Sequence, residues 1–483
     1  MHKPQSRHNF QSGNLLVLVL VFGSIFLIII SSFISSVIAQ SQVIEFRFQQ
    51  QQAGDIAEAG LNYYKWYLAH NSGDVSGGGV YEYTDPELGR IGEYELAVTG
   101  NSYCGQISSI EVESTGRTDA NPDAVAIISA TYKQPTVAEY SFINNEGVRF
   151  GDNRIITGPV HGNNWVQMDG AHNSFVGSGI ATYNGGGGVF TATPPDPSNA
   201  TPALFVYPID PINFTGLTID LSQMKTSADA DGIYYGPTTQ DGYKVVFNGN
   251  STVDIYTVRT LTNYWSYSTL EGWHTGEYNY IHPGSEIQIA NNLPIDPDCP
   301  VLFFEDKLWI EGAINQKVAI AAGLNSSNAQ NNIVIDGNVT YVAGTNAGLV
   351  VIAEDDIDVG IDVPTDMTAN GIYIAQNGRF GRNHYCDACG GPPIIGPWWN
   401  RRYTSYALPT ILEENILRNR LTRLGSVISN QRGGTAWTSG GGVTSSGFLI
   451  RDTSFDRDQI DDPPPLTPTT NDVYELQDWR QEG

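Results

Sequence analysis

Positive charge is scarce in this amino-acid sequence. Its 483 residues include 25 lysines and arginines against 51 aspartates and glutamates, which gives a formal net charge of -26. Nucleic-acid binding needs clustered lysine and arginine side chains, so this balance argues against DNA or RNA as a partner. Charged residues of both signs make up only 16% of the chain. A chain rich in glycine, asparagine and tyrosine and poor in lysine is typical of an extracellular β protein.

The short motifs of common enzymes are missing as well. The sequence contains no G-x-S-x-G, no H-E-x-x-H and no phosphate-binding glycine loop. A polysaccharide-active enzyme on a β-helix groove is the enzyme alternative, and it would need a basic residue or a second acid facing its carboxylates. No local motif supplies that pair. The sequence therefore favours a non-enzymatic protein.

One long apolar run lies near the N-terminus. Residues Leu15 to Ala39 carry no charge over 25 positions, enough helix to span a hydrocarbon core of about 30 Å. Lys3 and Arg7 precede the run, and the next basic residue is Arg47. The positive-inside rule then predicts a single-pass membrane protein with a cytoplasmic N-terminus and an extracellular remainder. A plain membrane anchor is one interpretation of this run.

A polar helical segment continues the apolar run. Residues 42–70 lack proline, and Ile56, Ala59, Tyr63 or Tyr64, and Tyr67 or Leu68 recur at helical spacing. We therefore predict one continuous helix over residues 14–72. Its outer half needs either a domain packed against it or neighbouring helices.

Three motifs follow one another in this region. Gln11-Ser12-Gly13 is followed directly by the apolar run, and Ala57-Glu58-Ala59-Gly60-Leu61 comes later. Their order resembles that of type IV pilin-like prepilins, in the PilX-like minor pilin variant. The resemblance implies that residues 1–13 are a basic leader and that a prepilin peptidase cuts between Gly13 and Asn14. It also implies that the apolar run lies in membrane lipid or among other pilin-like subunits, and this part of the helix includes Leu15, Leu16, Val17, Leu18, Phe26 and Ile30.

One position departs from the family pattern. Pilin-like subunits usually carry glutamate at the fifth mature position, and Leu18 stands there in this chain. In that family the carboxylate pairs with the free amine of a neighbouring subunit. Its absence fits a minor or tip component, or an uncleaved anchor, better than a repeating major subunit.

The remaining chain is predicted to be mainly β. Period-2 patterns over Tyr94–Thr99, Ser109–Ser114 and Ala124–Tyr132 predict a small antiparallel unit over residues 73–139 that covers the helix, with a loop at 100–105. Short apolar runs ending in Gly, Asn or Asp then recur through residues 140–455. Runs centred at 334, 351 and 373 lie 17 and 22 residues apart. This pattern of short strands and turns predicts a parallel β-helix, and a β-sandwich is the alternative.

Two segments depart from that pattern of short apolar runs. Residues 185–300 hold glycine runs, prolines and aromatic stretches, which we interpret as an insertion into the coils. Residues 456–483 contain Asp461-Asp462-Pro463-Pro464-Pro465 and are predicted to form a tail that caps the coil stack. The exposed tyrosines and tryptophans would allow contact with a surface glycan or a host-cell protein.

Candidate binding chemistry is limited to cysteines and acids. Cys386 and Cys389 are spaced to close a tight loop, which leaves Cys104 and Cys299 as the second disulfide if all four are oxidised. Glu354, Asp355, Asp356 and Asp358, with Asp362 nearby, form an acidic cluster. Oxygen-rich turns hold Ca²⁺, but this spacing does not match the EF-hand loop, and a solvated acidic surface is the simpler interpretation. We expect no other cofactor.

These observations together predict a minor or tip component of a type IV pilus-like filament, or a membrane-anchored cell-surface protein. The predicted β-helix of residues 140–455, the head, would serve adhesion or surface contact. A purely structural envelope protein without a ligand is a further alternative.

Overall fold

The computed structural model describes residues 13–87, 89–192, 199–214, 221–269, 272–325, 331–386, 394–395, 402–403, 408–439 and 442–482. The chain divides into two compact units. Unit 1 comprises Met1–Thr99, Ile110–Tyr132 and Leu476–Gly483, and unit 2 comprises Gly100–Ser109 and Lys133–Glu475.

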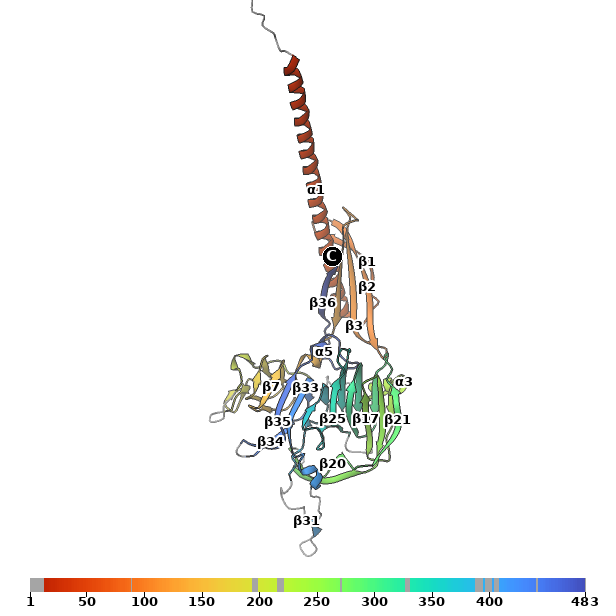
Figure 1. Ribbon diagram of the computed structural model, residues 1–483, viewed down its shortest axis with the longest axis vertical. Coiled ribbons are helices and arrows are strands. Elements are labelled where there is room, and N and C mark those ends of the chain that lie inside the picture. Colours follow the sequence, from red (N-terminus) through yellow and green to blue (C-terminus); the bar gives the residue numbers. More distant parts are fainter. Residues whose placement is uncertain are drawn as a thin grey trace, which may run out of the picture. The chain divides into compact units, whose positions relative to one another are not determined.

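Unit 1 is a long helix with a small sheet beside it. The helix α1 runs over Gly13–His70, 58 residues (Figure 1). The sheet has the order β1-β2-β3-β4-β36, and the β1–β2 and β3–β4 pairs are antiparallel. Its strands are β1 (Gly79–Asp85), β2 (Gly89–Tyr103), β3 (Gln106–Thr118), β4 (Val125–Lys133) and β36 (Glu475–Glu482).

The sheet covers only the C-terminal half of α1. One stripe of that half is buried at helical spacing, consisting of Ala53, Ile56, Ala57, Leu61, Tyr64 and Leu68. Ala59 and Tyr63, which the sequence placed on the stripe, are half-buried. Tyr132 on β4 donates its hydroxyl to the carbonyl oxygen of Leu61 at 2.8 Å. The helix therefore gains its tertiary stability from this half.

Glycines allow the helix and the sheet to approach closely. A Cβ atom at Gly116 on β3 would lie 2.1 Å from the carbonyl oxygen of Ala53, and one at Gly60 on α1 would lie 2.3 Å from Ser114 Oγ. Neither position has room for a side chain without a local shift. This contact is the physical reason for the glycine in the segment Ala57-Glu58-Ala59-Gly60-Leu61.

The predicted loop at residues 100–105 is mostly strand. The strands β2 and β3 continue to Tyr103 and from Gln106, and only Cys104 and Gly105 form the turn. Both residues have positive φ, 49° and 72°, as a tight two-residue hairpin turn requires. The sequence did not suggest this turn, because cysteine seldom occupies such a position.

Unit 2 is built of parallel strands that stack from coil to coil (Figure 1). One sheet has the order β15-β11-β8-β5-β33-β29-β26-β24-β22-β16, and all its neighbours on this path pair in parallel. Its strands are β5 (Phe142–Asn144), β8 (Val160–Gly162), β11 (Val176–Ser178), β15 (Phe205–Val206), β16 (Ile233–Tyr235), β22 (Val301–Phe304), β24 (Lys317–Ala322), β26 (Gly348–Ala353), β29 (Gly371–Ala375) and β33 (Leu417–Ser429).

Further sheets complete the coils of unit 2. A seven-stranded sheet has the order β21-β18-β17-β23-β25-β27-β30. Its β21–β18 and β18–β17 pairs are antiparallel, and its other neighbouring strands pair in parallel. Its strands are β17 (Gly242–Asn248), β18 (Thr252–Val258), β21 (Glu286–Pro294), β23 (Leu308–Ile314), β25 (Ile333–Tyr341), β27 (Ile357–Val359) and β30 (Phe380–Gly381). Shorter strands on the remaining sides are β6 (Val148–Phe150), β9 (Val166–Met168), β14 (Val189–Phe190), β7 (Arg154–Thr157), β10 (Ala171–His172), β28 (Asp366–Thr368), β34 (Ala436–Thr438) and β35 (Thr444–Ser454).

The remaining elements of unit 2 are short helices and small hairpins. The helices are η1 (Val137–Glu139), η2 (Pro202–Leu204), α3 (Leu221–Ala230), α4 (Thr410–Glu413) and α5 (Arg457–Asp461). Three two-stranded sheets pair β12 (Thr182–Tyr183) with β13 (Gly186–Gly187), β19 (Leu261–Ser268) with β20 (Gly272–Ile281), and β31 (Ile394–Ile395) with β32 (Arg402–Tyr403).

The coils are not stacked in the order of the sequence. The chain enters the stack at β5, builds coils as far as β15, and resumes at the opposite end with β16 before it returns to β33 beside β5. We call the contact between β33 and β5 the seam. There Val427, Ile428 and Ser429 stand opposite Phe142, Ile143 and Asn144. Two series of coils thus meet at residues that are far apart in the chain.

The main parallel sheet is buried on both faces. On β26, Leu349 and Val351 belong to the cluster inside the coils, while Val350 and Ile352 belong to a second cluster on the outer face. The outer cluster includes Leu221, Met224 and Ala228 of α3. Burial on both sides explains the continuous apolar runs in these strands.

The structure confirms a mainly β chain that follows a long N-terminal helix. The stacked parallel strands are the arrangement that a β-helix requires, and a sandwich of antiparallel sheets would not give them. Of the two predicted intervals, only that of 22 residues is a coil repeat, because Val351 stacks on Tyr373 while Val334 stacks in the other sheet. Within residues 185–300, the strands β16 and β17 belong to the stack.

The C-terminal tail has two parts. The predicted capping segment contains α5, and its residues Ile460 and Leu466 pack against the outer cluster of unit 2. The last residues form β36 beside β4 at the edge of the unit 1 sheet, and not a cap on the coils. The edge of β4 is thereby paired.

Candidate functional site

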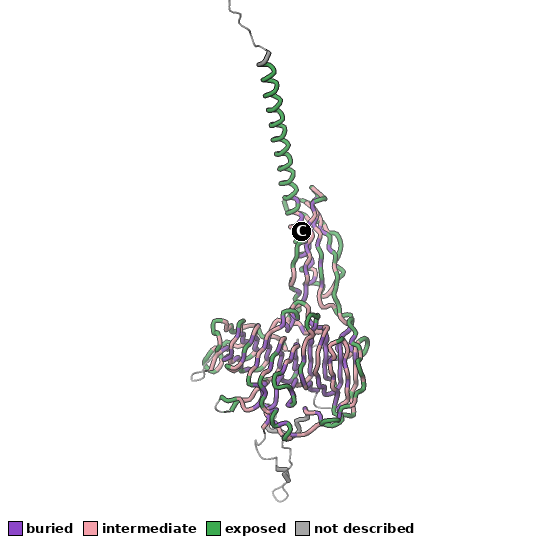
Figure 2. Tube along the Cα trace, viewed as in Figure 1, coloured by how far each residue is buried: buried purple, intermediate pink, exposed green. Residues whose placement is uncertain are grey.

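The N-terminal half of α1 is apolar and has no cover. Every described side chain from Leu15 to Phe48 is exposed (Figure 2). Among the described residues, α1 is the one helix long and apolar enough to cross a membrane. The exposed fractions of the predicted membrane residues are 71% for Leu15, 69% for Leu16, 59% for Val17, 56% for Leu18, 63% for Phe26 and 37% for Ile30. Such a surface is unfavourable in water and fits lipid or other apolar helices.

The predicted cleavage site lies where α1 begins. Gly13 is the first residue of the helix, and Asn14 is the second. Residues 1–12 of the predicted leader lie outside the described part of the chain. A cut after Gly13 would remove only the first residue of the helix.

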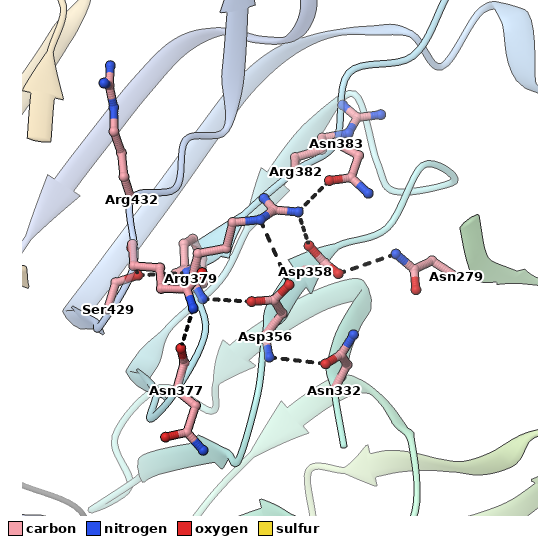
Figure 3. Close-up of polar contacts among 12 residues, drawn as sticks. Asn279, Asn332, Asp356, Asp358, Asn377, Arg379, Arg382, Asn383, Ser429 and Arg432 are labelled. Atoms are coloured by element: carbon pink, nitrogen blue, oxygen red, sulfur yellow. Dashed lines mark hydrogen bonds and ion pairs between the residues drawn. The ribbon is translucent and has the colours of Figure 1, made fainter. Parts of the chain in front are cut away.

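The acids predicted as a calcium cluster are divided among protein partners, and Figure 3 shows two of these acids, Asp356 and Asp358. Arg379, only 2% exposed, lies between two of them. Its Nη2 atom is 3.2 Å from Asp358 Oδ1, and its Nε atom is 3.8 Å from Asp356 Oδ2. The Arg379 backbone N–H also donates to Asp356 Oδ1 at 2.7 Å. These two acids compensate a buried cation.

The other acids of the cluster hold backbone in place. Glu354 Oε2 accepts hydrogen bonds from Leu324 N and from Asn331 Nδ2, each at 2.7 Å. Asp355 Oδ2 accepts from Asn331 N at 3.0 Å. Asp362 Oδ1 accepts from Asn415 Nδ2 at 2.8 Å. No three acids, cysteines or histidines among the described residues are grouped to hold a metal ion.

The cysteines are oxidised. Cys104 and Cys299 form a disulfide across 195 residues of sequence, which is the pairing that the sequence left for them. Cys386 is also disulfide-bonded, and its predicted partner Cys389 lies outside the described residues. Two oxidised cysteines at such a separation are typical of an exported protein.

A cluster that the sequence did not suggest lies on the outer face of the seven-stranded sheet. Lys244 on β17 places its Nζ atom 2.9 Å from Asp336 Oδ2, 2.9 Å from Glu311 Oε1 and 3.0 Å from Glu286 Oε1. The acids come from β25, β23 and β21. Three carboxylates therefore share one ammonium group. The only local signal is a lysine inside the apolar strand Tyr243–Phe247, because the partners are remote in sequence.

The excess of carboxylates affects protonation. Burial raises the pKa of Asp336 to about 7, against the attraction of Lys244, and the nearby Glu311 and Glu286 raise it further. Burial alone would lower the pKa of Lys244, but the charges of Asp336 and Glu311 more than offset it, so that pKa is raised. Asp336 is thus a carboxyl group that titrates near neutral pH beside a carboxylate.

An open groove runs past this cluster. Its volume is about 940 Å³, and its lining includes Glu311, Asp336, Asn338, Asp362, Asn415 and Arg418. These side chains offer carboxylates, amides and one guanidinium within a single depression, the donors and acceptors that sugar hydroxyls require. The groove belongs entirely to unit 2. The acids Asp355 and Asp356, which sequence analysis singled out, do not line it.

The comparisons with known proteins are sparse. No protein-family model matches the chain, and no curated protein is similar to it in sequence. Among solved structures, the competence-associated pilin ComZ from Thermus thermophilus aligns with 90% of this chain and 97% of its own chain, at 14% identity and a TM-score of 0.30. A likeness at that TM-score assigns neither the fold nor the function of this chain.

Proposed function

We propose that this chain is a non-enzymatic minor component of a type IV pilus-like filament, anchored through α1 and exposing a β-helix head for surface contact. The observation that carries the proposal is the division of α1 into two halves. One half is buried against the chain's own sheet, and the other exposes apolar side chains on all sides. A helix that must be covered by something outside the chain fits insertion among sister helices or into lipid.

Leu18 supports a minor subunit over a major one within this proposal. A major subunit would use a carboxylate at this position to meet the free amine of its neighbour. Leu18 is 56% exposed and offers only apolar contact, so it joins the packing of the apolar half without specifying a partner's register. A minor component at a tip or at low copy number needs no such repeated pairing.

The groove beside Lys244 is the surface we assign to contact. Its polar lining and its volume of about 940 Å³ suit a stretch of surface glycan. Asn338→Arg and Thr340→Arg would fill it, and Thr239→Arg at an exposed site outside it is the matched control. On a glycan array, the full chain in detergent should bind, the two groove variants should lose binding, and the control should retain it. Binding that survives both groove variants would contradict the assignment.

A specific observation keeps the enzyme alternative testable. Glu311 and Asp336 form the facing acids that the sequence alone did not supply, with Asp336 titrating near neutral pH. Incubation of the same glycans should give no cleavage products under the proposed function. Turnover that disappears in Glu311→Gln and in Asp336→Asn would favour a polysaccharide-active enzyme and contradict the non-enzymatic assignment.

The decisive experiment for the filament assignment is the mass of the mature N-terminus. In cells that contain a prepilin peptidase, the purified protein should begin at Asn14, and sheared filaments should contain it. Gly13→Leu should retain Met1. Gly23→Leu is the matched control, because a side chain at this other glycine of α1 meets nothing within 4 Å, and it should leave cleavage intact. Wild-type protein with Met1 retained would reduce the assignment to a plain membrane anchor.

A further inference from the structure

A small cavity lies at the seam between the two series of coils. Its volume is about 20 Å³, room for about one water-sized particle. The two series of coils both contribute to it. Phe142, Asn144 and Arg154 come from one series, and Arg423 and Thr435 come from the other.

Three residues that line this cavity each carry a buried polar atom with no hydrogen-bond partner among the described residues. These atoms are Asn144 Nδ2, Arg154 Nε and Thr435 Oγ1. The three residues are only 5%, 6% and 1% exposed. Each of these atoms carries a hydrogen that it can donate. A buried donor without an acceptor costs free energy, so three such donors on residues that line one cavity point to an acceptor inside it.

Arg154 has no compensating acid. Its guanidinium lies 5.7 Å from the centre of the Phe142 ring and 5.3 Å from that of Phe150. No hydrogen bond or ion pair joins this guanidinium to another described residue. Burial lowers the pKa of Arg154 well below its ordinary value, and the cations Arg451 and Arg423 lower it further. Arg379, by contrast, is buried to a similar degree but has two carboxylates beside it.

A second guanidinium borders the same cavity. That of Arg423 lies 5.2 Å from the Phe142 ring and 5.1 Å from the Phe380 ring, so Phe142 contacts both arginines. Arg423 Nη2 donates to Thr453 Oγ1 at 2.8 Å. No aspartate or glutamate occurs among the described residues that line the cavity. The described lining therefore carries two cations and no carboxylate, together with the three unpartnered donors of Asn144, Arg154 and Thr435.

We propose that this cavity binds one chloride ion. A single negative charge would compensate Arg154, and the ion would accept hydrogen bonds from the Asn144 amide, the Arg154 guanidinium and the Thr435 hydroxyl. The volume of about 20 Å³ is sufficient for a monatomic ion. Because the donors come from both series of coils, the bound ion stabilises the seam at which those series meet. This inference does not depend on the proposed function.

The test compares chloride with gluconate, an anion too large for the cavity, at equal ionic strength. Hydrogen exchange of the full chain in detergent is followed by mass spectrometry in peptides that contain Phe142–Asn144 and Val427–Ser429. Chloride and bromide should slow exchange in these peptides, and the unfolding midpoint should rise by roughly 2 °C per tenfold increase in chloride above its dissociation constant. Equal exchange in chloride and gluconate would overturn the proposal and leave a water molecule as the occupant.

Two variants and a control sharpen the test. Arg154→Met should abolish the chloride response and should fold in gluconate at least as well as wild type, because it removes an uncompensated buried charge. Thr435→Val removes one donor only and should weaken the apparent chloride affinity several-fold, so the test holds even if the arginine variant does not fold. Arg149→Met is the control, since Arg149 is exposed and pairs with Asp169 at 3.6 Å. An unchanged chloride affinity in Thr435→Val, or a chloride response that persists in Arg154→Met, would contradict the site.

Discussion

The N-terminal half of α1 and the interior of the coils depart from the usual distribution of side chains in opposite ways. In the first, leucines, isoleucines and phenylalanines from Leu15 to Phe48 face outward over the whole helix. In the second, arginines such as Arg154, Arg379 and Arg423 lie inside, each less than 9% exposed. Folded chains normally bury the first kind of residue and expose the second. Each region is therefore stable only with a suitable partner.

The difference between them lies in where the partner comes from. For Arg379 the chain provides its own acids, Asp356 and Asp358. For the C-terminal half of α1 it provides its own sheet. For the N-terminal half of α1, no described residue of the chain provides cover. Exposed apolar side chains or buried charged side chains therefore indicate an external partner only where no other part of the chain covers or compensates them.

The largest effect is expected on membrane association, from charged residues introduced into the N-terminal half of α1. Leu20 and Ile28 are 66% and 68% exposed, and each charged group at the centre of a bilayer costs about 3 kcal/mol or more. The double variant Leu20→Asp, Ile28→Asp should leave the membrane fraction almost completely. The measurement is the share of protein that sediments with membranes after alkaline extraction.

The control for that variant uses the same helix. Gln51→Asp adds a charge at an exposed position beyond the apolar run and should leave sedimentation unchanged. If the double variant also stayed with the membranes, the N-terminal half of α1 would not be the anchor.

A smaller effect is expected from removal of the compensated cation. Arg379→Met leaves Asp358, whose side chain is 6% exposed, without its counter-charge. Breaking a buried ion pair in this way costs about 3 to 5 kcal/mol, so the unfolding midpoint of unit 2 should fall sharply. Calorimetry of the full chain in detergent measures it. The double variant Arg379→Met, Asp358→Asn should recover part of the loss, and a similar loss in both would show that packing rather than charge is responsible.

The Lys244 cluster should make stability depend on pH. The pKa of Asp336 is raised in the folded state to about 7 from an ordinary value of 3.8. Between these values the folded state holds a proton that the unfolded state has lost, so stability should decrease as pH rises, by at most about 1.4 kcal/mol per pH unit. Above pH 7 this contribution is constant.

Denaturant unfolding of the full chain at several pH values measures the effect. Asp336→Asn should reduce the decrease between pH 5 and 7, whereas Asp254→Asn on the neighbouring strand β18 should leave it unchanged. An identical pH profile in wild type and Asp336→Asn would show that Asp336 titrates normally.

The smallest effect concerns the covered half of α1. A Cβ atom at Gly116 would lie 2.1 Å from the Ala53 carbonyl oxygen, so Gly116→Ala should push the sheet from the helix and cost about 1 to 3 kcal/mol. Hydrogen exchange of the amides of residues 53–61 should accelerate. Gly54→Ala is the matched control, because its Cβ atom has no neighbour closer than 4.0 Å and alanine favours helix by up to about 1 kcal/mol. Destabilisation by both variants would contradict the close contact.

Part of this architecture could be predicted from the sequence. The uncharged run after Leu15 and the absence of proline through residue 70 predicted α1. Alternation in the segment Ala124–Tyr132 predicted β4, and short apolar runs predicted most coil strands, because these signals lie within a few neighbouring residues.

The order of the coils could not be predicted. The seam joins Phe142 to Val427, and no local pattern specifies a contact between residues so distant. The same limit applies to Lys244, whose three acids come from separate strands, and to the arginines at the seam, which look like ordinary surface residues in sequence. Cys104 and Cys299 were found only because few cysteines are present to be paired.

The central claim is that α1 holds the chain at a membrane or filament, while the stacked coils of residues 140–455, the coil body, face the environment. It is tested most directly by protease treatment of intact cells that produce the protein, with the released peptides identified by mass spectrometry. The account predicts that peptides from residues 140–455 are released from intact cells, while the segment from Leu15 to Ala39 stays with the membrane or filament fraction. Release of coil-body peptides only after the cells are lysed would contradict it.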